Sequence, residues 1–297
     1  MVRTAPSSSG SSSPHPQSIF EATNGDTLLQ SSDSFLFSVH RCILIQASPV
    51  FCDLFHIPPP ATLGSSPRTV VGPIPISETA HVLDALLRLI YPLPPPSFDN
   101  LSDLVPVLAA CLRYQMTAAC VYLRQQLIST SNVLREPLRV FAIACRFGLV
   151  AEAREASRAT LRINIMDAPL CEDMRYVSAY DFQRLLVLHR ERAQAARRLI
   201  TGRSRRNDLT CSQCTRFGSG RHPTSPRWWY EFERRAKEEL TRRPLTDIIF
   251  SMRFLSDCAK AGCTSCGTSL LDSHAFLETL KVEIDALPDT LSPTGDY

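Results

Sequence analysis

The chain has 297 residues, which is enough for two packed units because one domain takes on the order of 100 to 200 residues. Its residues are 44% hydrophobic, 8% aromatic and 21% charged, close to the averages of soluble globular proteins. This composition excludes a wholly disordered chain, and no uninterrupted apolar run approaches the roughly 18 residues of a membrane-spanning helix.

The composition of the chain's ends and its cysteines indicate the cellular compartment of the protein. Residues 1–17 are rich in Ser and Pro and carry no apolar segment of a secretion signal, so we expect a disordered tail there, and another over residues 291–297. Eleven cysteines, an odd number, favour reduced thiols over a disulfide framework. We therefore expect a protein of the cytoplasm or the nucleus.

The formal net charge of +3 hides an uneven distribution. Residues 1–130 carry six basic and eight acidic side chains, whereas residues 175–243 carry seventeen basic and seven acidic ones. Such a basic stretch can attract a polyanion or an acidic partner surface, and it is also typical of a solvated helical face.

The pattern near the N-terminus predicts a β-hairpin. Residues 27–30 and 35–39 have the composition of short strands, and residues 31–34 have that of a turn. Alternation in the second strand places Phe35, Phe37 and Val39 on one face, as in a half-buried sheet.

Helices and one further strand follow the hairpin. Residues 42–46 and 49–55 predict two short helices, and Pro49 suits the first turn of the second one. Proline and glycine indicate a loop over residues 57–68, before an extended piece at 69–76.

Three more helices complete this region. Ser77 with Glu78 predicts a helix start, and the apolar spacing that follows ends at Tyr91 and Pro92. Two further helices are expected at about residues 99–114 and 117–128.

Three segments of this region resemble BTB/POZ domains in the family's order. They are D-T-L-L-Q-S-S-D-S-F-L-F-S-V-H-R-C-I-L-I-Q-A-S-P-V-F-C-D-L-F (26–55), I-P-I-S-E-T-A-H-V-L-D-A-L-L-R-L-I-Y-P (74–92) and L-V-P-V-L-A-A-C-L-R-Y-Q-M (104–116). The resemblance implies an α+β domain over residues 18–130, with a small sheet flanked by helices. It also implies a non-enzymatic, protein-binding role in which the chain forms a homodimer or recruits other proteins.

The same resemblance implies a partner surface. In the family, the residues that align with Asp26 and Arg41 form a charged pocket near the dimer interface. We assign His40, Phe51 and Phe55 to the same partner or dimer surface, although His40 resembles a structural histidine of the fold. The alternative for Asp26 and Arg41 is an internal ion pair that orders the hairpin against the first helix.

BTB domains that bind cullin scaffolds commonly carry a hydrophobic-x-Glu motif after the helix that ends here near Phe55. This chain has H-I-P-P-P-A-T-L (56–63) instead. The departure weakens the interpretation as a cullin adaptor, which stays the leading specific alternative.

Residues 131–205 predict a helical extension, with helices at about 133–146, 149–165 and 178–201. The last helix begins with a capping-box-like start, in which Ser178 is followed by Asp181. Its helical spacing places His189 at a core boundary rather than in a metal site.

Residues 206–290 contain two C-x-x-C pairs, Cys211 with Cys214 and Cys263 with Cys266. Two such pairs can supply the four thiolates of a tetrahedral, structural zinc site. Forty-eight residues lie between the pairs, so the site would join distant segments around a helix with an aromatic cluster. That cluster comprises Trp228, Trp229, Tyr230 and Phe232.

Alternatives to this zinc site remain. Cys258 or His222 could replace one ligand, and the thiols could also stay unligated. Redox chemistry is disfavoured because a thioredoxin-like pair belongs near a βαβ pattern, which the sequence lacks. The segments C-S-Q-C, P-R-W-W-Y-E-F-E-R-R-A and A-G-C-T-S-C-G resemble the C-terminal region of a poorly characterised group of fungal BTB proteins.

The sequence therefore predicts a non-enzymatic interaction scaffold. A substrate adaptor of a cullin-type ubiquitin ligase and a BTB transcriptional regulator are the alternatives. The basic run Arg203 to Arg206 is typical of a solvated linker, and we do not expect nucleic-acid binding because no base-reading helix follows it. The sequence contains no phosphate loop, nucleophile elbow or H-E-x-x-H motif.

Overall fold

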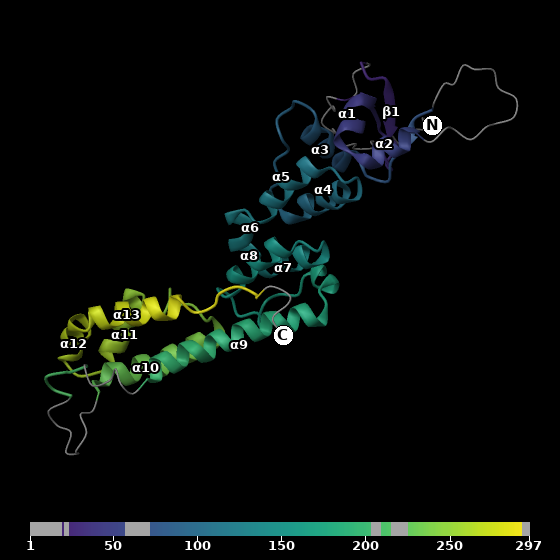
Figure 1. Cartoon of the computed structure of the whole chain (residues 1–297). Helices are drawn as coiled ribbons and strands as arrows, with labels where there is room; N and C mark the ends of the chain where they lie inside the picture. Colours follow the sequence, from purple (N-terminus) through teal and green to yellow (C-terminus); the bar gives the residue numbers. More distant parts are fainter. Residues whose placement is uncertain (1–19, 21–23, 57–71, 203–208, 215–224, 293–297) are drawn as a thin grey trace, which may run out of the picture. The chain divides into compact units, whose positions relative to one another are not determined.

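The computed structural model of the chain describes residues 20, 24–56, 72–202, 209–214 and 225–292. The chain divides into two compact units, residues 1–125 and 126–297. Figure 1 shows the strands and short helices of the first unit in purple and blue, and the helices of the second unit from teal to yellow.

The first unit contains a small mixed sheet. Strands β1 (Thr27–Gln30) and β2 (Leu36–Val39) are antiparallel, and β1 also pairs in parallel with β3 (Ile74–Pro75). The strand order is β2-β1-β3. The predicted hairpin is confirmed, and the predicted third extended piece contributes only its last residues to the sheet, with residues 69–71 outside the described part of the chain.

The two faces of the hairpin differ in burial. Leu29, Phe37 and Val39 are buried, as the alternation predicts. Phe35 lies one residue before β2 and is exposed, so the expectation that it shares the buried face is wrong. The reason is that pleat alternation holds only for residues inside the paired strand.

Five helices, α1 to α5, lie in the same region of the chain as this sheet among the described residues. Pro49 begins the second of them, as predicted, because a helix leaves the amide of its first residue unpaired and proline has none to pair. Their bounds are α1 (Arg41–Ala47), α2 (Pro49–His56), α3 (Ala80–Ile90), α4 (Leu101–Arg113) and α5 (Thr117–Leu127).

The start of α3 differs from the prediction. The helix begins at Ala80, and the Oδ1 atom of Asp33, in the hairpin turn, accepts a hydrogen bond from the Ala80 amide over 2.8 Å. Glu78 is buried instead and accepts hydrogen bonds from Arg113 and the Tyr114 hydroxyl. The expected local cap is therefore replaced by a side chain distant in sequence.

The second unit begins with helices α6 (Thr130–Arg135), α7 (Pro137–Arg146) and α8 (Val150–Thr160). The single helix predicted over residues 133–146 is thus two helices. The break falls at Pro137, because proline lacks an amide hydrogen and disfavours helical geometry in the residue before it.

A short 3-10 helix, η2 (Glu172–Tyr176), precedes the long helix α9 (Ala179–Thr201). The predicted capping start of α9 is confirmed: Ser178 Oγ accepts from the Asp181 amide over 3.0 Å and donates to the Asp181 carboxylate over 2.6 Å. His189 is buried in this helix.

In the described residues after α9, four helices share a core with the C-terminal half of that helix. In Figure 1 they form the green and yellow group beside that helix. Ala196 and Ile200 of α9 lie in one buried cluster with Trp228, Trp229 and Phe232. The helices are α10 (Arg227–Arg242), α11 (Met252–Lys260), α12 (Cys266–Asp272) and α13 (His274–Asp285).

The chain after α13 crosses back over the earlier helices. The buried guanidinium of Arg192 donates to the carbonyl oxygens of Pro244 and Ile284, and also to those of Leu287 and Pro288. Ser157 Oγ accepts a hydrogen bond from the Leu291 amide over 3.2 Å. Leu291, which we assigned to the terminal tail, is thus in contact with α8. None of the described helices is long and apolar enough to cross a membrane.

Candidate metal centre

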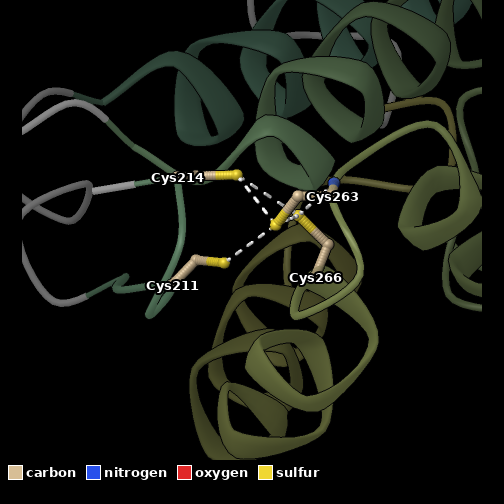
Figure 2. A group of neighbouring side chains, drawn as sticks. All are labelled: Cys211, Cys214, Cys263 and Cys266. Carbon is tan, nitrogen blue, oxygen red and sulfur yellow. Dashed lines mark hydrogen bonds between the residues drawn. The ribbon is translucent and has the colours of Figure 1, made fainter. Parts of the chain in front are cut away.

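The four predicted cysteine ligands meet at one place in the second unit. Cys211 and Cys214 lie on the loop before α10, whereas Cys263 follows α11 and Cys266 begins α12. Figure 2 shows the four side chains pointing toward one another. All four Sγ atoms lie within 4.8 Å of one another. The two pairs, distant in sequence, therefore form one cluster.

The Sγ separations suit a metal ion. Cys263 Sγ lies 3.5 Å from that of Cys211 and 3.3 Å from that of Cys214, and Cys266 Sγ lies 3.6 Å from both Cys214 and Cys263. A tetrahedral zinc ion with Zn–S bonds of about 2.3 Å separates its sulfurs by about 3.8 Å, whereas a disulfide joins them at about 2.05 Å. The geometry and the all-thiol donor set thus fit a structural zinc ion.

Backbone amides also point at the sulfurs. The first two amides of α10, at Arg227 and Trp228, donate to Cys214 and Cys266, and the Cys263 amide donates to Cys266 Sγ over 3.3 Å. The N-terminus of a helix favours negative charge, because its free amides and its dipole are positive there. These contacts favour thiolates, which are the metal-binding form of cysteine.

The thiols perturb one another when no cation is present. Burial acts to raise the pKa of Cys263, but hydrogen bonds from Cys214 and Cys211 outweigh it and lower that pKa to about 7. Burial raises the pKa of Cys266 to about 12 and also raises the pKa of Cys214. Four thiolates this close therefore require a cation at neutral pH, and Zn²⁺ would supply the charge.

Gly262, just before Cys263, permits the close approach of the second pair. A Cβ atom at this position would lie 2.3 Å from Cys266 Sγ and 2.7 Å from Cys266 Cβ. Real side chains do not approach that closely, so only glycine fits without a shift of the cysteine. This contact appears only in three dimensions, where the Gly262 backbone lies against the Cys266 side chain.

Sequence reasoning missed the residues that hold the two cysteine loops together. Trp228 Nε1 donates to Ser269 Oγ, and Ser269 Oγ donates to the carbonyl oxygen of Thr210, next to Cys211. No spacing rule relates these three positions, because they come from α10, α12 and the first cysteine loop. The buried Trp228 was the available signal, since a buried indole N–H usually has a partner.

The substitute ligands behave differently. Cys258 is fully buried in the apolar core beside α10, and burial raises its pKa to about 11. It is not one of the four clustered cysteines. His222 lies outside the described residues. The four ligands first predicted are therefore the set that the structure brings together.

Three of the five residues predicted for a partner surface in the first unit are neighbours. Asp26 Oδ1 accepts from the backbone amide of Arg41 over 2.7 Å, and this hydrogen bond lowers the pKa of Asp26. The Arg41 guanidinium donates to the Phe55 carbonyl oxygen and lies 4.7 Å from the centre of the Phe55 ring. Asp26 thus caps α1 through the backbone, and Arg41, Asp26 and Phe55 are neighbours.

The other two residues assigned to this surface, Phe51 and His40, make contacts within the unit. Phe51 is 1% exposed, and its ring stacks against Tyr114 at 4.9 Å and Phe55 at 6.2 Å. The His40 amide donates to the Tyr91 hydroxyl over 2.7 Å. In the described structure the Phe51 ring therefore offers no surface to a partner.

The small mixed sheet and the helices make the first unit an α+β domain. The comparison with known families agrees with this fold. Residues 19–131 match the BTB/POZ domain family. The chain therefore contains a BTB/POZ domain, a class that mediates protein–protein interaction and is typically non-catalytic. No curated protein matches the chain. The resemblance of the cysteine-bearing half to a fungal group therefore stays a prediction.

Proposed function

We propose that this chain is a non-enzymatic scaffold in which the BTB/POZ domain forms a homodimer and the helical second unit recruits another protein. The observation that carries the proposal is the BTB/POZ match over residues 19–131, together with the mixed sheet and helices found there. Domains of this family mediate protein interactions and often dimerise.

The outer face of the hairpin supports a self-association surface. Leu28 and Leu36 share that face, because they occupy alternate positions to the buried Leu29 and Phe37 in the strand register. Their exposed fractions are 43% and 47%. Leu28 faces Ser38 and Leu36 faces Gln30, so the two leucines are diagonal neighbours on this face. Two such exposed leucines are a candidate association site, since exposed apolar surface tends to be covered in an assembly.

The cysteine cluster supports a structural metal in the same scaffold. Four thiolate ligands leave no open coordination position, so a zinc ion bound there would stabilise the fold rather than catalyse a reaction. The metal would fix the α10 to α13 helices and the cysteine loops as one module.

Size-exclusion chromatography with light scattering on the full chain tests the dimer. We expect a mass twice that of the 33.1 kDa chain at micromolar concentration. Leu36→Asp places a charge on the hairpin face and is expected to give a monomer. Val121→Asp on α5, where the side chain is 51% exposed, is the matched control and should stay dimeric. A monomeric wild-type chain, with and without zinc, would contradict the proposal.

The two narrower functions depend on segments that the structure does not describe. Residues 57–63, where the cullin motif is missing, and Arg203 to Arg206, the basic run, both lie outside the described residues. A cullin adaptor would copurify with a cullin. A DNA-binding regulator would bind DNA with an affinity that falls steeply with salt, because phosphate contacts release counterions.

A further inference from the structure

The second unit contains a pocket whose rim is rich in arginine. The pocket has a volume of about 500 Å³ and is lined by residues from three separate segments. Arginines from the first two helices of the unit, from the turn after α8 and from the end of α10 converge on it. They are Arg135, Arg139, Arg162, Arg242 and Arg243.

The arginines differ in what they already bind. Arg139 pairs with Glu136 over 3.1 Å and with the buried Asp173 over 2.9 Å, and Arg243 pairs with Glu239 over 2.5 Å. Arg162 and Arg242, in contrast, are exposed and have no acidic partner within the described part of the chain. Two guanidinium groups on this rim are therefore available to an incoming anion.

We call the apolar part of the lining the pocket floor, of which Pro137 and Leu138 are buried. Pro137, Leu138 and Ile163 line it, together with Ala168 and Pro169. Leu170, between two lining residues, is 92% exposed, although leucine usually lies inside. An apolar floor with a cationic rim matches a segment that presents one apolar side chain beside carboxylates.

We propose that this pocket binds an acidic peptide segment of a partner protein, with an aliphatic anchor on the pocket floor and neighbouring carboxylates on Arg162 and Arg242. Guanidinium groups bind carboxylates in a two-pronged, charge-assisted geometry, which gives both strength and direction. This inference identifies the recruitment surface of the scaffold proposed above. It rests on that role but not on the dimer, because every lining residue belongs to the second unit.

The lining favours a peptide over a nucleic acid. Single-stranded nucleic acids are held by aromatic side chains on which bases stack, and none of the described residues that line this pocket is aromatic. The carboxylates of Glu136 and Asp167 also lie on the lining and would repel a run of phosphates. A peptide can place isolated carboxylates at the arginines and avoid these acids.

Fluorescence anisotropy on the full, zinc-loaded chain tests the proposal. The probes are labelled peptides of about 12 residues, a length typical of linear recognition segments, with a central leucine flanked by aspartate and glutamate. Matched probes replace the leucine with alanine, or the acidic flanks with serine or lysine. We expect binding of the acidic leucine peptide, weaker binding of the alanine and serine probes, and none of the lysine probe.

Variants of the chain locate the site. Arg162→Glu and Arg242→Glu should each weaken binding by about tenfold or more, because each removes a charge-assisted contact. Arg162→Glu combined with Arg242→Glu is the double pocket variant. Arg190→Glu with Arg197→Glu, two exposed positions of α9, is a control for the same change of net charge. Light scattering on each variant shows separately whether the dimer persists, so failure of this site and failure of dimerisation are distinguishable.

Three outcomes would overturn the proposal. One is equal weakening by the α9 control, which would show a response to net charge alone. Another is equal binding of the leucine and alanine probes, which would remove the anchor. The third is binding of a single-stranded thymidine oligonucleotide, but of no peptide, that is lost on Arg162→Glu.

Discussion

Trp228 Nε1 donates a hydrogen bond to Ser269 Oγ over 2.9 Å, and this contact joins α10 to α12 across the cysteine cluster. Ser269 Oγ in turn donates a hydrogen bond to the carbonyl oxygen of Thr210 over 2.6 Å. This relay of two hydrogen bonds therefore connects α10, whose first amides donate to the cysteine sulfurs, to α12 and to the loop of Cys211.

Ser269→Ala should break this relay. The change leaves the buried Trp228 N–H and the Thr210 carbonyl without their partner, which costs about 1–3 kcal/mol of unfolding free energy. Loss of a contact that orients metal ligands should also weaken zinc binding by about tenfold. Urea denaturation and competition with a zinc chelator measure the two effects. Ser256→Ala, at an exposed position of α11, should change neither.

Gly262→Ala should disturb the metal site directly. The added methyl group would lie 2.3 Å from Cys266 Sγ, so the cysteine must move and the bound zinc per chain should fall. Gly267→Ala is the matched control, because beyond its chain neighbours and its own helix backbone no described atom lies within 4 Å of its added Cβ. Since Gly267 lies within α12, that change should stabilise the helix by about 0.5–1 kcal/mol. Equal zinc content in both variants would contradict the proposed packing.

Cys211→Ser should abolish zinc binding. The reduced wild-type chain should contain one zinc ion by elemental analysis and the variant none, because a serine hydroxyl does not replace a thiolate at such a site. Limited proteolysis should then cleave the second unit while the BTB/POZ domain persists. Cys42→Ser, at an exposed position of α1, should keep the metal. A wild-type chain that folds stably without metal would count against a structural zinc.

His189 should make stability depend on pH. Burial lowers its pKa to about 4 in the folded chain, whereas an unfolded histidine titrates near 6.5. The folded state therefore binds fewer protons between these values. Stability is full above about pH 6.5 and is lost as the pH falls toward 4, by up to about 3 kcal/mol.

Denaturation of wild type and His189→Gln at several pH values measures this effect. The stability difference between the two chains should shrink on acidification, because only the wild type retains this buried titrating group. His274→Gln removes a largely exposed histidine and should track the wild type at every pH. A constant difference between wild type and His189→Gln would show that His189 does not titrate in this way.

Local sequence patterns were sufficient to predict the parts of this protein that depend on neighbouring residues. Alternating apolar residues gave the β1–β2 hairpin, and the spacing of Ser178 and Asp181 gave the start of α9. The BTB/POZ assignment followed from three segments in one order, and the family comparison supports it over residues 19–131. Each cysteine pair was also evident, because a C-x-x-C turn is local.

The tertiary packing of each unit selects which distant groups meet. It placed Cys211 beside Cys263 and brought Gly262, which has no side chain, against Cys266. It also supplied the cap of α3 from Asp33. It also gathered arginines from three segments around one pocket. Local periodicity records how a residue relates to its own helix or strand, but it carries no information on which remote segment packs against it. That choice depends on the packing of the whole unit.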